Sequence, residues 1–136
     1  NDPDRVGYLF PDFREEEKRY YTEHRIHPIM HTVVIRKDIY AQHKWVAQSL
    51  YKAFLAAKDW AQEAMYFSGA QKYMLPWLFD DLREIDEVFG GDPWPYGIDE
   101  NRPTLEAFVK YMHQQNFIPE VIPVDDLFAP THGRLD

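Results

Sequence analysis

The chain has 136 residues, of which 45% are hydrophobic and 16% aromatic, a composition that predicts one folded domain with enough apolar residues for a sizeable core. Its formal net charge of -8 argues against nucleic acid or an anionic membrane as a general partner, because both bind to basic surfaces. Zero cysteines exclude disulfides and cysteine-ligated zinc, and the lack of a signal peptide or an apolar run of about 18 residues favours a cytoplasmic protein without a membrane partner.

The first residues, NDPDRVGYLF, begin abruptly, with neither an initiator Met nor a capped element. We therefore expect the chain to be a piece of a longer protein. The first helix is expected over 12–24, because Asp12 with Glu15 three residues later forms the pattern of a capping box. The residues that follow, FREEEKRYYTEH, are so highly charged that most of this helix should be solvated.

The segment IMHTVVIR predicts a strand over about 29–36, because its β-branched residues follow one another without a helical period. Both alternating faces are largely apolar, which is typical of a strand covered on both sides in an α/β sheet. The backbone of such a strand needs partners. We expect these partner strands to come from upstream residues of the longer protein or from a second copy of the chain. In the second case a homo-oligomer would form through the unpaired strand edge.

Three further helices are predicted. Apolar residues at steps of three and four indicate a helix over about 44–67 that ends before Gly69. Pro76 suits the first turn of a helix over 76–89, which Gly90 and Gly91 end. Pro103 begins a last helix over about 103–115, and the tail is expected to be extended.

The segment from His24 to Lys37 is the sharpest candidate site, because it holds three histidines and two arginines with no acid before Asp38, in an otherwise acidic chain. The guanidinium groups of Arg25 and Arg36 suit carboxylates, and a histidine such as His31 can exchange protons near neutral pH. The alternative is that His31 is a buried strand residue satisfied by one backbone hydrogen bond.

A metal site is not expected, because His27 and His31 on a strand lie about 13 Å apart, too far to share one ion. The loop DPWPYG presents Trp94 and Tyr96 between prolines, which suits the walls of a site for a flat aromatic ligand, although such residues can equally close the bottom of a core. The sequence has no Gly-rich phosphate loop, nucleophile elbow or serine triad pattern. Nucleotide and ordinary hydrolase chemistry are therefore unsupported, and no cofactor is expected.

Several segments taken in order carry a resemblance to a known family: HPIMHTVVIRKDIYAQHKWVAQSLYKAFLAAK, YMLPWL, WPYGIDENRPTLEAF and LFAP. From about Phe10 to Pro130 the chain resembles the C-terminal portion of the 4,5-dihydroxyphthalate decarboxylase family. The resemblance implies an α/β fold, in which this chain is the helix-rich C-terminal part of a two-lobe periplasmic-binding-protein type II-like protein. By the same resemblance, residues 29–36 would be the strand that crosses back into the first lobe beside the ligand cleft.

The resemblance also implies a lyase that decarboxylates a small anionic aromatic dicarboxylate to a protocatechuate-type product in aromatic compound catabolism. His31 is the expected catalytic proton donor, Arg25 or Arg36 would bind a carboxylate, and Trp94 or Tyr96 would stack on the ring. Relatives tend to have a hydrophobic residue where this chain has His27, so His31 is preferred. Two alternatives stay open: a solute-binding protein of the same fold without catalysis, and a structural fragment that is inactive by itself.

Overall fold

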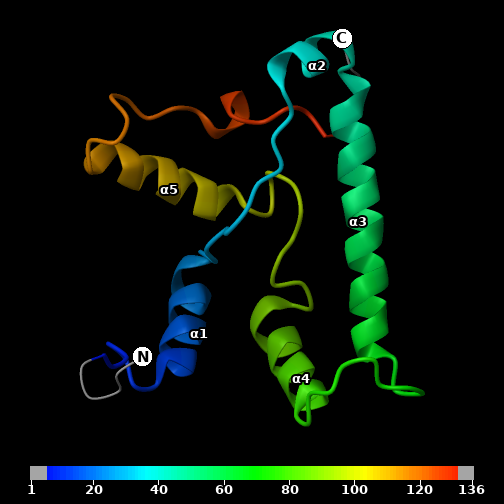
Figure 1. Cartoon of the computed structure of the whole chain (residues 1–136). Helices are drawn as coiled ribbons and strands as arrows, with labels where there is room; N and C mark the ends of the chain where they lie inside the picture. Colours follow the sequence, from blue (N-terminus) through cyan, green and yellow to red (C-terminus); the bar gives the residue numbers. More distant parts are fainter. Residues whose placement is uncertain (1–5, 132–136) are drawn as a thin grey trace.

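The computed structural model describes residues 6–131, which form α-helices and one short 3-10 helix and contain no strand (Figure 1). The elements in chain order are α1 (Phe13–His24), α2 (Lys37–Gln42), α3 (Trp45–Tyr66), α4 (Leu78–Phe89), α5 (Arg102–Gln114) and the 3-10 helix η1 (Val124–Asp126). The four helices expected from the sequence are all present, with ends that differ from the predicted ones by at most two residues. In Figure 1, α3 runs along one side of the molecule, and α1 and α4 lie at the level of its C-terminal half.

Residues 25–36 cross the middle of the molecule from α1 to α2, and the strand predicted at 29–36 is not formed there (Figure 1). The physical reason is that a strand exists by hydrogen bonding to a neighbouring backbone, and no other segment of residues 6–131 pairs with this one. Both faces of the segment are exposed in this chain, because Val33 is 63% and Val34 87% exposed, and the expected cover on both sides stays a prediction. A sheet around this segment, and the two-lobe fold, stay predictions.

Helix α3 packs against α4. Ala64 of α3 and Leu78 and Leu82 of α4 are buried, as the three-and-four spacing of apolar residues predicts. The hydroxyl of Tyr66 donates to Asp86 Oδ1 at 2.6 Å and ties the C-terminal turn of α3 to α4. Helix α4 ends at Gly90, which adopts a left-handed conformation (φ 74°) that favours glycine.

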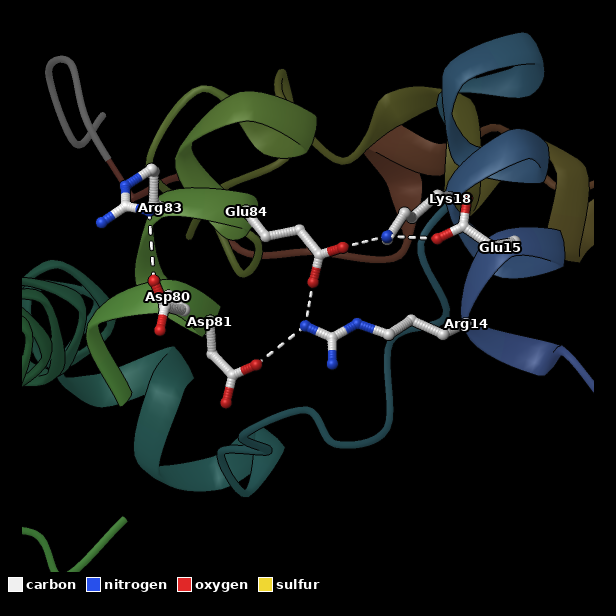
Figure 2. A network of polar contacts seen from close by, with 7 residues as sticks. All are labelled: Arg14, Glu15, Lys18, Asp80, Asp81, Arg83 and Glu84. Carbon is white, nitrogen blue, oxygen red and sulfur yellow. Dashed lines mark hydrogen bonds and ion pairs between the residues drawn. The ribbon is translucent and has the colours of Figure 1, made fainter. Parts of the chain in front are cut away.

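Helix α1 contacts α4 through ion pairs and through the ring of Tyr21, whose centre lies 4.4 Å from that of the Phe89 ring, and none of its residues is buried. Figure 2 shows Arg14 between Asp81, at 2.8 Å, and Glu84, whose carboxylate also binds Lys18. The predicted capping box of α1 is wrong: Asp12 is the N-cap residue, but its carboxylate makes no capping bond. Glu15 pairs with Lys18 at 2.5 Å, so an ion pair within the helix replaces the bond to the N-cap backbone.

Helix α5 packs on η1, where Val109 and Val124 are buried. The guanidinium of Arg102 donates to both carboxylate oxygens of Asp125, at 2.9 and 3.2 Å, and fixes the tail against the start of α5. This paired geometry is the strongest form of exposed ion pair, since two parallel hydrogen bonds define one orientation.

The core is smaller than the composition predicts. Within residues 6–131 no large side chain is fully buried, and many large apolar side chains, among them Phe54, Trp60 and Trp77, are exposed. The helices are spread around the extended segment (Figure 1), so each meets few neighbours, and apolar area is removed from water only where elements touch. No helix of this part of the chain is long and apolar enough to cross a membrane.

The bond between Tyr66 and Asp86 predicts a pH effect. This hydrogen bond, with some burial, raises the pKa of Tyr66 from 10.0 to about 12, so the stabilisation is complete below pH 10 and is lost as the pH rises toward 12. Tyr66→Phe should lower the free energy of unfolding by about 0.5 kcal/mol at neutral pH, because the bond is half-exposed. Chemical unfolding followed by circular dichroism measures this change. Tyr73→Phe, outside the helices, is the control and should have no such effect.

The pair of Arg102 and Asp125 predicts the opposite pH dependence. Hydrogen bonding to Arg102 lowers the pKa of Asp125 below its ordinary value of 3.8, so its stabilising effect is present above that value and is lost as the pH falls through the lowered pKa. Asp125→Asn should lower the melting temperature at neutral pH, and the difference from wild type should disappear in strong acid. An equal loss in Asp126→Asn, the neighbouring acid, would show that the pairing is not the cause.

Candidate functional site

An open groove of about 680 Å³ lies between the extended segment, α3 and the loop that joins α4 to α5. Residues 27–33 form one wall, Leu50, Tyr51 and Phe54 of α3 form another, and residues 93–98 form the third. The first turns of α5 and residues 128–131 complete it. This volume is in the range of small-molecule sites, and the walls are mostly aliphatic and aromatic, as such sites usually are.

The two histidines of the extended segment have different surroundings. His31 is exposed and lines the groove, so the alternative of a buried strand histidine is wrong. His27 also reaches the groove but is half-buried: its backbone N–H donates to Thr104 Oγ1 at 3.2 Å, and its ring lies 5.1 Å from that of Phe89. His31 is therefore the histidine with the freer access to a ligand.

The loop that carries Trp94 and Tyr96 is fixed by hydrogen bonds to its backbone. The side-chain amide of Asn101 donates to the carbonyl oxygens of Pro95, at 2.6 Å, and Gly97, at 2.8 Å. The hydroxyl of Tyr51 on α3 donates to the Tyr96 carbonyl at 3.3 Å. Trp94 is 51% and Tyr96 41% exposed, and both line the groove, so they form a wall of the site and do not close the bottom of a core.

Lys58 of α3 holds the same loop and was missed by the sequence reasoning. Its ammonium group lies 2.5 Å from Asp92 Oδ2 and donates to the Trp94 carbonyl at 3.1 Å. A signal was present, because Lys58 follows Phe54 by four residues and so occupies the apolar face of its helix. A lysine in such a position indicates a partly buried ion pair.

The two arginines proposed to bind a carboxylate do not line this groove. Arg25 ends α1 in a left-handed conformation (φ 56°) and lies 5.4 Å from the centre of the Tyr21 ring. Arg36 is exposed and pairs with Asp38 at 2.5 Å, a hydrogen bond that lowers the pKa of that carboxyl group. The structure thus brings together His31, Trp94 and Tyr96, and the carboxylate contact of either arginine stays a prediction.

No metal centre is formed in the described part of the chain, where no group of three or more histidine or carboxylate side chains could hold an ion. The groove offers aromatic walls that can bind a ring and an exposed imidazole, that of His31, for proton exchange.

The bonds of Asn101 predict that the loop depends on this side chain. Asn101→Ala should destabilise the protein by about 1–3 kcal/mol, because two partly buried carbonyl groups lose their donor. Thermal unfolding measures the loss. Gln114→Ala, at the exposed far end of α5, is the matched control, and a similar shift in both variants would contradict the role of the amide.

No protein-family model matches the chain. Over 125 residues, 92% of its length, it is 33% identical to the 4,5-dihydroxyphthalate decarboxylase of Comamonas testosteroni. The chain spans 38% of the length of that protein. The resemblance stated from the sequence is thereby confirmed: over nearly all of its own length, this chain is related to 4,5-dihydroxyphthalate decarboxylase.

Proposed function

We propose that the protein carrying this chain is a carboxy-lyase that removes CO2 from an aromatic dicarboxylate of the 4,5-dihydroxyphthalate type. The observation that carries the proposal is the 33% identity over 92% of the chain to a decarboxylase of this name. The groove supports it, because a site with two exposed aromatic side chains and the exposed imidazole of His31 suits a flat ring that must accept a proton.

The proposed reaction requires a proton at the ring carbon that bears the departing carboxylate. The hydroxyl group para to this carbon supplies the electrons and becomes carbonyl-like, while His31 gives the proton to the carbon. The carbon–carbon bond to the carboxylate then breaks, CO2 leaves, and the bonding pair restores the aromatic ring. The para hydroxyl keeps its proton throughout and is an ordinary phenol again, His31 takes a new proton from solvent water, and the product is a dihydroxybenzoate of the protocatechuate type.

Trp94 and Tyr96 have the second role in this proposal, which is to hold the ring. Their loop is fixed to α3 and α5, so little conformational freedom is lost when a ligand binds. A carboxylate of the substrate would meet Arg25 or Arg36 only after a rearrangement, because neither side chain lines the groove and Arg36 is already paired with Asp38.

Release of CO2 separates this proposal from solute binding without chemistry. The full-length protein is incubated with 4,5-dihydroxyphthalate, and CO2 and protocatechuate are measured together with binding of the substrate. Formation of both products at equal rates supports the decarboxylase. Binding with no CO2 release would contradict it and would favour a solute-binding protein.

His31→Asn should reduce turnover by about 10²–10⁴-fold, the usual contribution of a general acid or base, and should change substrate affinity much less. The reason is that asparagine keeps a polar side chain in the groove wall but cannot exchange a proton near neutral pH. Steady-state kinetics and calorimetric titration measure the two effects.

His43→Asn is the control for this experiment, because His43 ends α2 with its ring 6.2 Å from that of Trp45 and does not line the groove. It should leave both turnover and affinity unchanged. Unchanged turnover in His31→Asn would remove His31 from the mechanism.

A further inference from the structure

Lys58 lies behind the aromatic wall of the groove and is only 13% exposed, although it carries a charge. Its ammonium group has three neighbours: Asp92 Oδ2 at 2.5 Å, the Trp94 carbonyl at 3.1 Å, and the Tyr96 ring with its centre 4.6 Å away. A lysine ammonium group offers three donors, so these contacts use most of what the side chain can form. Lys58 thus touches both aromatic residues of the wall.

Asp92 is held from several directions, which makes it a firm partner for Lys58. One of its oxygens accepts hydrogen bonds from the side-chain amide of Gln62 on α3, at 3.3 Å, and from the backbone N–H of Trp94, at 3.1 Å. Lys58 and Gln62 are four residues apart on one face of α3 and therefore reach the loop together. The loop is fixed at its start by these contacts and at its end by Asn101.

The charges decide what Lys58 can do for a ligand. None of the described residues that line the groove is a lysine or an arginine, so Lys58 is a cation that reaches this wall from behind. Its pairing with Asp92 makes the two groups neutral together, which leaves little net field for an anion in the groove. Lys58 therefore acts on a ligand through the position of the wall.

We propose that Lys58 is a positioning residue that sets the orientation of Trp94 and Tyr96 and thereby the affinity of the groove for an aromatic ring. This inference rests on the proposed function, which supplies the substrate. It adds that a side chain outside the groove sets the position of the wall that binds the ring. A cation over the face of a tyrosine is attracted by the ring quadrupole, so Lys58 fixes the plane of the Tyr96 ring as well as the backbone of the loop.

The kinetic test compares three variants of the full-length protein with 4,5-dihydroxyphthalate as substrate. Lys58→Met keeps an unbranched side chain of similar length but removes the charge, and Lys58→Arg keeps the charge. Lys52→Met, an exposed position on the same helix, is the matched control. Lys58→Met should raise KM about tenfold with kcat changed less than about threefold, because a binding wall contributes equally to the ground state and the transition state.

Lys58→Arg should recover most of this loss, and Lys52→Met should behave as wild type. An unchanged KM in Lys58→Met, or an equal rise in Lys52→Met, would overturn the inference. A fall in kcat without a rise in KM would also overturn it, because that result would place Lys58 in the chemical step.

A second measurement decides the inference even where no decarboxylation is found. The indole N–H signal of Trp94, assigned in the ¹H–¹⁵N NMR spectrum by its loss in Trp94→Phe, reports the position of the loop without any substrate. It should shift and broaden in Lys58→Met and stay unchanged in Lys52→Met. An unchanged signal in Lys58→Met would overturn the positioning role, whereas a shifted signal without CO2 release would contradict only the proposed function.

Discussion

The hydrogen bonds that fasten the loop between α4 and α5 are the interactions on which the candidate site depends. The loop contains two prolines and a glycine with φ 107°, so no regular ladder satisfies its backbone. Polar side chains replace that ladder: Lys58 and Tyr51 reach the loop from α3, and Asn101 reaches it from the start of α5. Two helices are thereby joined through one loop, and their apolar faces become the walls of a groove.

The same arrangement explains why so much apolar surface stays open. Polar contacts connect the elements at a few points, such as Tyr66 with Asp86, Arg102 with Asp125, and Arg14 with Asp81. Such contacts fix how the elements are oriented but remove little apolar area from water, whereas stability grows with the apolar area that is buried. The groove is a part of this open apolar surface that is walled on three sides, and one of these walls is the unpaired extended segment.

Local features of the fold could be predicted from the sequence. The periodicity of apolar residues predicted α3, since it depends on neighbours three and four positions away in the chain. Pro76 and Pro103 predicted the beginnings of α4 and α5, and Gly90 marked the end of α4 because its conformation is local. The strand at 29–36 was expected from local composition, but forming it requires a second backbone segment, which residues 6–131 do not supply. The capping box failed because Lys18 competes for Glu15.

Only part of the candidate site could be predicted, because residue type is visible in the sequence and long-range contacts are not. His31, Trp94 and Tyr96 were named from residue type, and all three line the groove. Arg25 and Arg36 were named from charge alone, but charge does not determine where a side chain points. Arg25 lies over the Tyr21 ring, and Arg36 pairs with Asp38. The place of Lys58 on the apolar face of α3 was visible in the sequence, but its partners were not, because they lie more than thirty positions away in the chain.

The character of the groove bears on the chemistry proposed for it. Losing CO2 disperses the concentrated charge of a carboxylate, so surroundings that solvate this charge poorly favour the step more than water does. The walls of the groove are mostly aliphatic and aromatic, and Lys58, whose ammonium group lies over the Tyr96 ring, is paired with Asp92. A strong cation in direct contact with the departing carboxylate would stabilise the substrate more than the transition state. The position of Lys58 behind the wall, and not inside the groove, therefore agrees with a site that holds a ring firmly and leaves one carboxylate free to depart.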